Sequence, residues 1–168
     1  LYWSYWHLVD GSWQYAVAQS EGITVGSDSV LYVLSTSTNS LFKLTLTGSL
    51  IDEITEADME AGAGVNLITP TGVAVDYAHN IFIVDQGNGD LYMGSIQDGT
   101  NQPTSYLWAR LLNTNNEYNR IDVDKFGNLY ITDSDLSNDI VVYSQAGNLL
   151  HSWGGSGTGT GQFDYPAG

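Results

Sequence analysis

The sequence contains no cysteine, four lysine and arginine residues in total, three prolines and no long hydrophobic run. Without cysteine, disulfides, thiolate metal ligands and a cysteine nucleophile are excluded. The scarcity of basic residues leaves a formal net charge of −15. That charge excludes an electrostatic nucleic-acid binder and argues against docking on anionic lipid. Because no apolar stretch approaches the roughly 18 residues of a membrane span, we expect no membrane insertion.

The residues that are plentiful favour short strands joined by turns. Gly, Ser, Asn and Asp favour turns, while Tyr, Trp, Val, Ile and Thr favour strands. Hydrophobic residues make up 42% of the 168 positions, so intrinsic disorder is not expected and the chain is long enough for one domain with a core. The sequence predicts an all-β protein, with a short helical turn expected only within residues 53–64.

A repeat of about 48 residues organises the chain. The segments GITVGSDSVLYVLS, GVAVDYAHNIFIVD and RIDVDKFGNLYITD align, and they begin at Gly22, Gly72 and Arg120. A fourth copy begins within residues 163–168. One position of each copy is a valine and another is a large aromatic residue. We predict that these residues are buried: Val25, Val75, Val123, Tyr32, Phe82 and Tyr130.

Each copy is long enough for four short antiparallel strands, which is the number of strands in one blade of a β-propeller. We therefore predict one partial β-propeller of four-stranded antiparallel blades, with about three and a half blades present. Residues 1–20 form the end of a blade. Residues 21–68, 69–116 and 117–162 each form a blade, and residues 163–168 start the next one.

The motifs GQFDYPAG (161–168), TPTGVAVDYAHNIFIVD (69–85) and IDVDKFGNLYITD (121–133) resemble the NHL-repeat family of β-propellers. The resemblance covers about residues 21 to 168. The first copy departs from it, with Gly26 and Ser35 where the other copies have Asp. Propellers of this family typically have about six blades, so the resemblance implies either a longer polypeptide or two chains that close one ring.

Acidic loops after the second strand of two copies are the candidate metal site. Their carboxylates are hard oxygen ligands of the kind that Ca²⁺ prefers. The same residue types also form turns by bonding their own backbone, and no EF-hand spacing is present. The candidate ligands are Asp85, Asp90, Asp133, Asp135 and Asp139. No other cofactor is expected. Asp76 and Asp124 recur at one position of the repeat, so we expect them to cap turns rather than to form a central site.

Aromatic residues near both ends of the chain are the candidate interaction surface, since Tyr and Trp anchor protein partners and stack on sugars. Packing between blades is the alternative role for these rings. The candidates are Tyr2, Trp3, Tyr5, Trp6, Trp13, Phe163 and Tyr165. The partners we expect are protein, either the rest of the same polypeptide or neighbouring copies, with a glycan as a further class.

The sequence shows no convergent catalytic set, because the repeat places His7, His79 and His151 apart. We therefore expect a binding or structural assembly module rather than an enzyme, within a longer surface or filament-forming polypeptide. The alternative is a metal-dependent propeller enzyme of the lactonase or lyase type, which rests on fold analogy. The lack of Cys, the low Lys content and the abundance of Ser, Thr, Asn and Gly favour an extracellular or cell-surface location.

Overall fold

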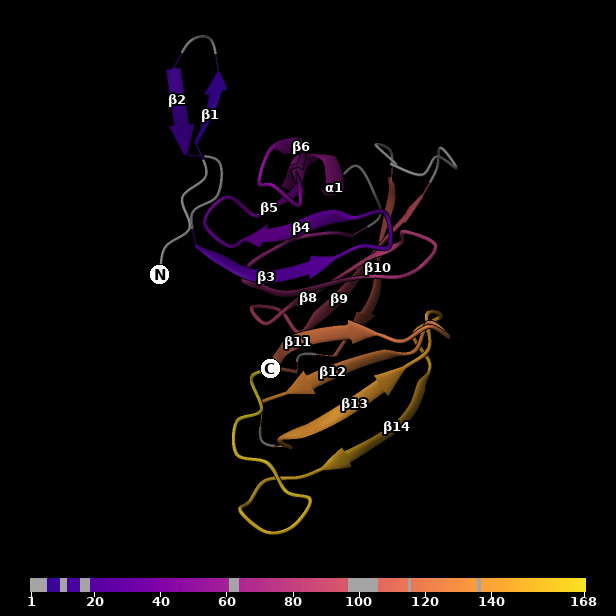
Figure 1. The fold of residues 1–168 in the computed structure, drawn as a ribbon. Coiled ribbons are helices and arrows are strands. Elements are labelled where there is room, and N and C mark those ends of the chain that lie inside the picture. Colours follow the sequence, from indigo (N-terminus) through magenta and orange to yellow (C-terminus); the bar gives the residue numbers. More distant parts are fainter. Residues whose placement is uncertain are drawn as a thin grey trace.

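The computed structural model describes residues 6–9, 12–15, 19–60, 64–96, 106–114, 116–135 and 137–168. Three sheets of four antiparallel strands make up most of the protein (Figure 1). Blade 1 contains β3 (Ser20–Val25), β4 (Val30–Ser35), β5 (Ser40–Thr45) and β6 (Leu50–Ile54). Blade 2 contains β7 (Pro70–Val75), β8 (Ile81–Asp85), β9 (Asp90–Ile96) and β10 (Tyr106–Asn113). Blade 3 contains β11 (Tyr118–Val123), β12 (Leu129–Asp133), β13 (Asp139–Tyr143) and β14 (Leu149–Gly154).

In each blade the four strands pair in chain order, which confirms the predicted four-stranded antiparallel blades. The strands β1 (Trp6–Val9) and β2 (Ser12–Tyr15) pair with each other in a separate hairpin. The first strands of the blades are neighbours in space, with β7 between β3 and β11. Blade 2 therefore lies between blades 1 and 3 (Figure 1).

Two apolar clusters hold the three blades together. Alternate side chains of a strand point to opposite faces of its sheet, so blade 2 contributes to both clusters. Val73 faces blade 1 and packs in a cluster with Tyr32, whereas Ala74 faces blade 3 and packs with Leu129. All six residues of β7 and all five of β8 are buried as a result.

This arrangement explains where the predicted burial of the repeat positions holds and where it fails. The valine of each copy faces the preceding blade, and the aromatic residue faces the following one. Val75 and Phe82 of blade 2 are both buried, as is Tyr32 of blade 1. The prediction is wrong for Val25, which is 57% exposed because no described blade covers that face of β3.

The corresponding residues of blade 3 are only half-buried. Val123 faces blade 2 at the edge of the second cluster. Tyr130 faces away from blade 2, where no described blade covers it. Val25 and Tyr130 therefore lie on opposite outer faces of the three-blade array.

In blades 2 and 3 an aspartate closes the turn between the first and second strands, as predicted for Asp76 and Asp124. Asp76 Oδ1 accepts the backbone N–H groups of Ala78 and Asn80, both at 2.8 Å. Asp124 Oδ1 accepts those of Phe126 at 2.8 Å and Asn128 at 2.9 Å. These bonds close Asx turns and leave both carboxylates in structural roles.

Blade 1 has Gly26 at this position and obtains its turn-closing carboxylate two residues later. Asp28 Oδ1 accepts the N–H of Val30 at 3.1 Å, and Asp28 Oδ2 accepts the hydroxyl of Tyr32 at 3.0 Å. A Cβ atom on Gly26 would lie 2.4 Å from Asp28 Oδ1. The glycine therefore makes room for the displaced carboxylate.

Replacing Ser29 with glycine is expected to stabilise the protein by about 0.5–1 kcal/mol. Ser29 is exposed and has φ 62°, in the left-handed region that costs a residue with a Cβ atom. The equivalent residue of blade 3 is Gly127, with φ 84°. Chemical denaturation of S29G measures the gain, and a loss of stability would contradict the turn conformation.

One short helix, α1 (Glu56–Glu60), follows blade 1 inside the range predicted for a helical turn. Thr55 caps it: the hydroxyl accepts the N–H of Asp58 at 3.3 Å, and Asp58 Oδ2 accepts the N–H of Thr55 at 2.9 Å. The Thr55 hydroxyl also donates to that carboxylate, and these bonds lower the pKa of Asp58. Across the described ranges, no helix has the length and apolarity needed to span a membrane.

Candidate functional site

The predicted metal ligands lie in the loops that join the second and third strands of blades 2 and 3. Asp85 is fully buried at the end of β8. Its carboxylate accepts three backbone N–H groups, from Ile68 at 2.6 Å, Thr69 at 2.9 Å and Gly87 at 2.8 Å. Since residues 68 and 69 precede β7, Asp85 attaches the connection from blade 1 to the second strand of blade 2.

Asp133 occupies the equivalent position at the end of β12 and is also fully buried. It accepts the side-chain amide of Asn116 at 2.7 Å and the N–H of Asp135 at 3.1 Å. A backbone bond recurs beside this position in all three blades. It joins Thr36 N to Gln19 O at 3.1 Å, Gln86 N to Thr69 O at 3.0 Å, and Ser134 N to Glu117 O at 3.0 Å.

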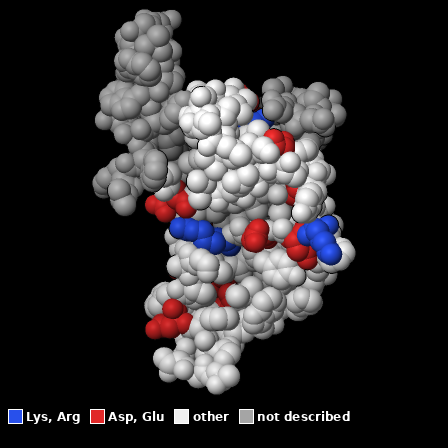
Figure 2. Space-filling model, viewed as in Figure 1, with Lys and Arg blue, Asp and Glu red and all other residues white. Residues whose placement is uncertain are grey.

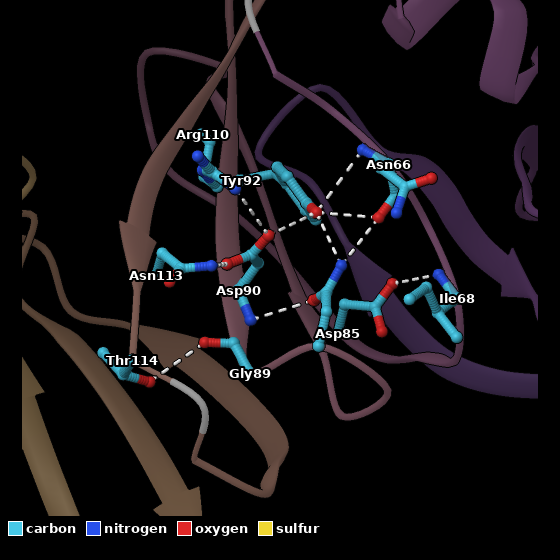
Figure 3. A network of polar contacts seen from close by, with 10 residues as sticks. Asn66, Ile68, Asp85, Gly89, Asp90, Tyr92, Arg110, Asn113 and Thr114 are labelled. Carbon is cyan, nitrogen blue, oxygen red and sulfur yellow. Dashed lines mark hydrogen bonds and ion pairs between the residues drawn. The ribbon is translucent and has the colours of Figure 1, made fainter.

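Asp90 begins β9 and lies at the centre of a buried polar network (Figure 3). Its carboxylate accepts the hydroxyl of Tyr92 at 2.8 Å and the side-chain amide of Asn113 at 2.6 Å. Arg110 approaches the same carboxylate at 3.4 Å. Desolvation, followed by the neighbouring Asp90 carboxylate, raises the pKa of Tyr92 above its usual range. The network ties β9 to β10 and leaves Asp90 surrounded by donors from its own chain.

Asp135 and Asp139 share one hydroxyl in the blade 3 loop. Ser137 Oγ lies 2.9 Å from Asp135 Oδ1 and 2.8 Å from Asp139 Oδ1. Asp135 Oδ1 also accepts the N–H of Ser137 at 2.7 Å. Within the part of the chain that the structure describes, no group of three or more His, Cys, Asp or Glu side chains is placed to hold a metal ion.

We expect that adding Ca²⁺ leaves the melting temperature of the protein unchanged, because the five candidate carboxylates already accept bonds from the chain's own donors. Thermal unfolding followed by circular dichroism, with Mg²⁺ as the matched control, measures this. A rise in melting temperature that is specific to Ca²⁺ and lost in D135N would contradict the turn interpretation and support the calcium site.

Burial raises the pKa of Asp133 to about 6, and the nearby carboxylates of Asp135 and Asp139 raise it as well. Desolvation also raises the pKa of Asp85, against the three N–H bonds that favour its charged form. Because the folded state holds the Asp133 proton more tightly than the unfolded state, the stabilising contribution of this residue is complete below about pH 4. It is lost as the pH rises to about 6.

The free energy of unfolding should therefore fall between about pH 4 and pH 6, by at most about 3 kcal/mol from Asp133. D133N removes the titrating group, so it should flatten this part of the pH profile. D164N, which replaces an exposed carboxyl outside the acidic loops, should leave the profile unchanged. Urea denaturation at a series of pH values measures the slopes, and equal slopes in all three proteins would contradict the raised pKa.

The candidate interaction residues are only partly described. Tyr2, Trp3 and Tyr5 lie outside the described residues. Trp6 and Trp13 lie in β1 and β2, at register positions opposite Tyr15 and Leu8. The ring of Phe163 packs against Gly154, where a Cβ atom would lie 2.6 Å from Phe163 Cδ2, and Tyr165 is 71% exposed. A bond from Tyr165 N to Asn138 Oδ1 at 2.8 Å holds this segment against blade 3.

Sequence reasoning missed the apolar side chains on the outer faces of the array. Ile23 is 67% exposed on β3, and Trp153 is 45% exposed on β14. Trp153 lies edge-on to Tyr130, with the ring centroids 6.4 Å apart. The signal that would have found these residues is their place in the outermost described copies, on the side that faces away from blade 2.

The ends of β3, β7 and β11 surround a hollow of about 240 Å³. Val25, Val75 and Val123, which are equivalent in the repeat, all line it. Its other walls are mostly polar and include Thr24, Ser27, Tyr77 and Asp122. Sequence analysis did not select Tyr77 or Asp122, because neither residue recurs between the copies.

No protein-family model matches the chain, and no curated protein matches it in sequence. Among solved structures, it is similar to a chain of the nidogen–laminin complex, with TM-score 0.59, 22% identity, and coverage of 88% of this chain and 57% of that one. It is similar to a catalytically inactive virginiamycin B lyase from Staphylococcus aureus with quinupristin, with TM-score 0.58, 17% identity and coverage of 86% and 46%. It is also similar to the calcium-binding protein regucalcin from Agrobacterium tumefaciens, with TM-score 0.60, 10% identity and coverage of 85% and 50%.

The chain spans about half the length of these solved structures. They include a protein from a complex of two proteins, a lyase and a calcium-binding protein, so they show a shared architecture and no single activity. Together with the three four-stranded sheets, these similarities show that the chain has a β-propeller fold.

Proposed function

We propose that this chain is a binding and assembly module of the NHL type, whose outer blades pack against further blades of its own polypeptide or of a neighbouring copy. One observation carries the proposal. Ile23 and Val25 on β3 are 67% and 57% exposed, whereas the equivalent Val73 and Val75 on β7 are 4% and 9% exposed. In blade 2 a neighbouring blade covers these positions, so the face of β3 has the composition of a blade–blade interface with no described blade against it.

The outer face of blade 3 supports the same proposal. Tyr130 is half-buried there, whereas the equivalent Phe82 is fully buried between blades 2 and 3. In the view of Figure 2, acidic side chains are separated by wide areas of residues that carry no formal charge, polar and apolar alike. With a net charge of −15, copies of the chain repel one another, so association depends on burying apolar area of this kind.

An extracellular location belongs to the same proposal and rests on the composition, which lacks Cys and is poor in Lys. We include a role in a surface or filament-forming polypeptide in the proposal, because no described blade covers the two outer faces and a repeating unit of this kind can add further units there.

Sedimentation velocity of the 168-residue chain tests the proposal. We expect a closed dimer or larger species, and we expect I23T/V25T to shift the chain toward the monomer, since threonine keeps the strand propensity but removes apolar area. L46S is the matched control, because Leu46 is 62% exposed in the turn between β5 and β6, away from the blade faces. A stable folded monomer, or equal effects of the two variants, would contradict the proposal.

A further inference from the structure

Two polar residues that line the hollow between the inner strands, Asp122 and Tyr77, are not repeated between the blades. Asp122 stands where blades 1 and 2 have Thr24 and Ala74. Tyr77 stands where the other two blades have Ser27 and Lys125. Residues that recur in every blade are accounted for by the blade fold itself. A carboxylate and an aromatic ring that each occur once, on the wall of one hollow, call for a different explanation.

The electrostatic surroundings of the hollow favour a cation. Three carboxylates lie next in sequence to its lining residues: those of Asp28, Asp76 and Asp124. Their oxygens accept backbone N–H groups of the turns that follow the inner strands, and Asp122 is the carboxylate on the wall of the hollow itself. The lining, as the described residues give it, contains no lysine, arginine or histidine. A carboxylate on the wall of a hollow whose described lining has no basic side chain favours ligands of the opposite charge.

The remaining walls fit an aliphatic stem that carries this cation. Val25, Val75 and Val123 supply apolar surface from all three inner strands. Tyr77 is 74% exposed, so its ring is accessible to a cation beside the hollow. A lysine side chain has this division between a (CH₂)₄ stem and a charged end.

The bonding of Asp122 favours an ammonium group over a guanidinium group. Asp122 Oδ1 accepts the N–H of Val123 at 2.8 Å, and no described residue donates to Oδ2. The Oδ2 atom can accept a single N–H from a compact ammonium group. A guanidinium group binds carboxylates best through two parallel bonds, and the second of these would share Oδ1 with the Val123 N–H. We propose that this hollow binds the lysine side chain of a polypeptide ligand, with its stem on the three valines and its ammonium group at Asp122.

Methyl NMR titration of the chain tests this proposal with three short capped peptides, Gly-Lys-Gly, Gly-norleucine-Gly and Gly-Arg-Gly. The lysine peptide should shift the methyl signals of the three valines, and added salt should weaken the binding of this peptide. The norleucine peptide keeps the stem without the charge, so its affinity should be about fivefold lower than that of the lysine peptide. Tighter binding of the arginine peptide would overturn the proposal in favour of a guanidinium site, and the absence of valine shifts with the lysine peptide would overturn it outright.

Two variants complete the test. D122N keeps the acceptor for Val123 N and removes the charge, so it should weaken the lysine peptide about fivefold without changing the melting temperature. D164N removes an exposed carboxyl at the other end of the inner strands and should leave the affinity unchanged. Equal affinities in D122N and the unsubstituted chain would overturn the proposal. Neither substitution touches Ile23 or Val25, so failure of this site leaves the sedimentation test of blade packing unaffected.

Discussion

Truncating Phe82 to alanine should lower the free energy of unfolding by about 3–5 kcal/mol. Phe82 is fully buried in β8 and packs in the apolar cluster between blades 2 and 3, which includes Leu129 and Ile131. Removing the ring loses its transfer free energy and leaves a cavity that two rigid sheets cannot close. Urea denaturation measures the change, and a fall in midpoint at constant slope would show that the loss is one of stability alone.

Tyr130 provides the matched control, because it occupies the same position of the repeat in β12. Tyr130 is half-buried, and its ring centroid lies 6.4 Å from that of Trp153. Its hydroxyl donates to Asp124 Oδ2 at 3.3 Å. Y130A should therefore cost about 1 kcal/mol. A loss below about 1 kcal/mol for F82A, or equal losses for the two variants, would show that the alignment of the copies is out of phase.

The comparison of these two residues also shows what the sequence could predict. The repeat located the strands and their pairing order, since strand alternation and turn residues recur at a fixed spacing. It could not say which copies have a blade on each side, because burial depends on neighbours in space. Val25 and Val75 occupy the same position of the repeat, yet Val25 is 57% exposed and Val75 is 9% exposed.

Turn chemistry was predictable where the residue type recurs and unpredictable where another residue replaces it. Asp76 and Asp124 close their turns as expected. In blade 1 the position of this aspartate is Gly26, and Asp28 performs the task from a different place in the turn. The alignment shows only the missing aspartate, whereas the structure shows that Asp28 reaches the N–H of Val30, which is equivalent to the Asn80 N–H bonded by Asp76.

The candidate calcium loops show a different limit. Their residue types fit both a metal site and a set of turns, and the two differ in what each carboxylate oxygen contacts. At Asp85 those contacts are backbone N–H groups, which every sequence carries. For the same reason, no residue pattern marks Asp85 as the link between blade 2 and the connection that precedes it.

Replacing Asp85 with alanine should lower the free energy of unfolding by about 2–4 kcal/mol at neutral pH. The substitution removes the acceptor of three N–H groups, those of Ile68, Thr69 and Gly87. Relief of a buried carboxylate, whose pKa burial raises, offsets part of this loss. The three bonds are nevertheless expected to dominate, because each is charge-assisted and two of them fix the chain that leads into β7.

Ser35 is the control for this prediction, since it is the fully buried residue at the same position of blade 1. Its hydroxyl lies 3.2 Å from that of Ser37 and accepts that of Thr38 at 3.1 Å, and both of these partners are neutral hydroxyl groups of the loop after β4. S35A should therefore cost about 1 kcal/mol, close to the value of a single neutral hydrogen bond. Hydrogen exchange separates the two cases further: D85A should speed exchange at the amides of Ile68 and Thr69, because their acceptor is gone and the connection between blades 1 and 2 opens locally. Unchanged exchange at these amides, or a loss in D85A no larger than in S35A, would show that the connection is held by the packing of β7 rather than by the Asp85 carboxylate.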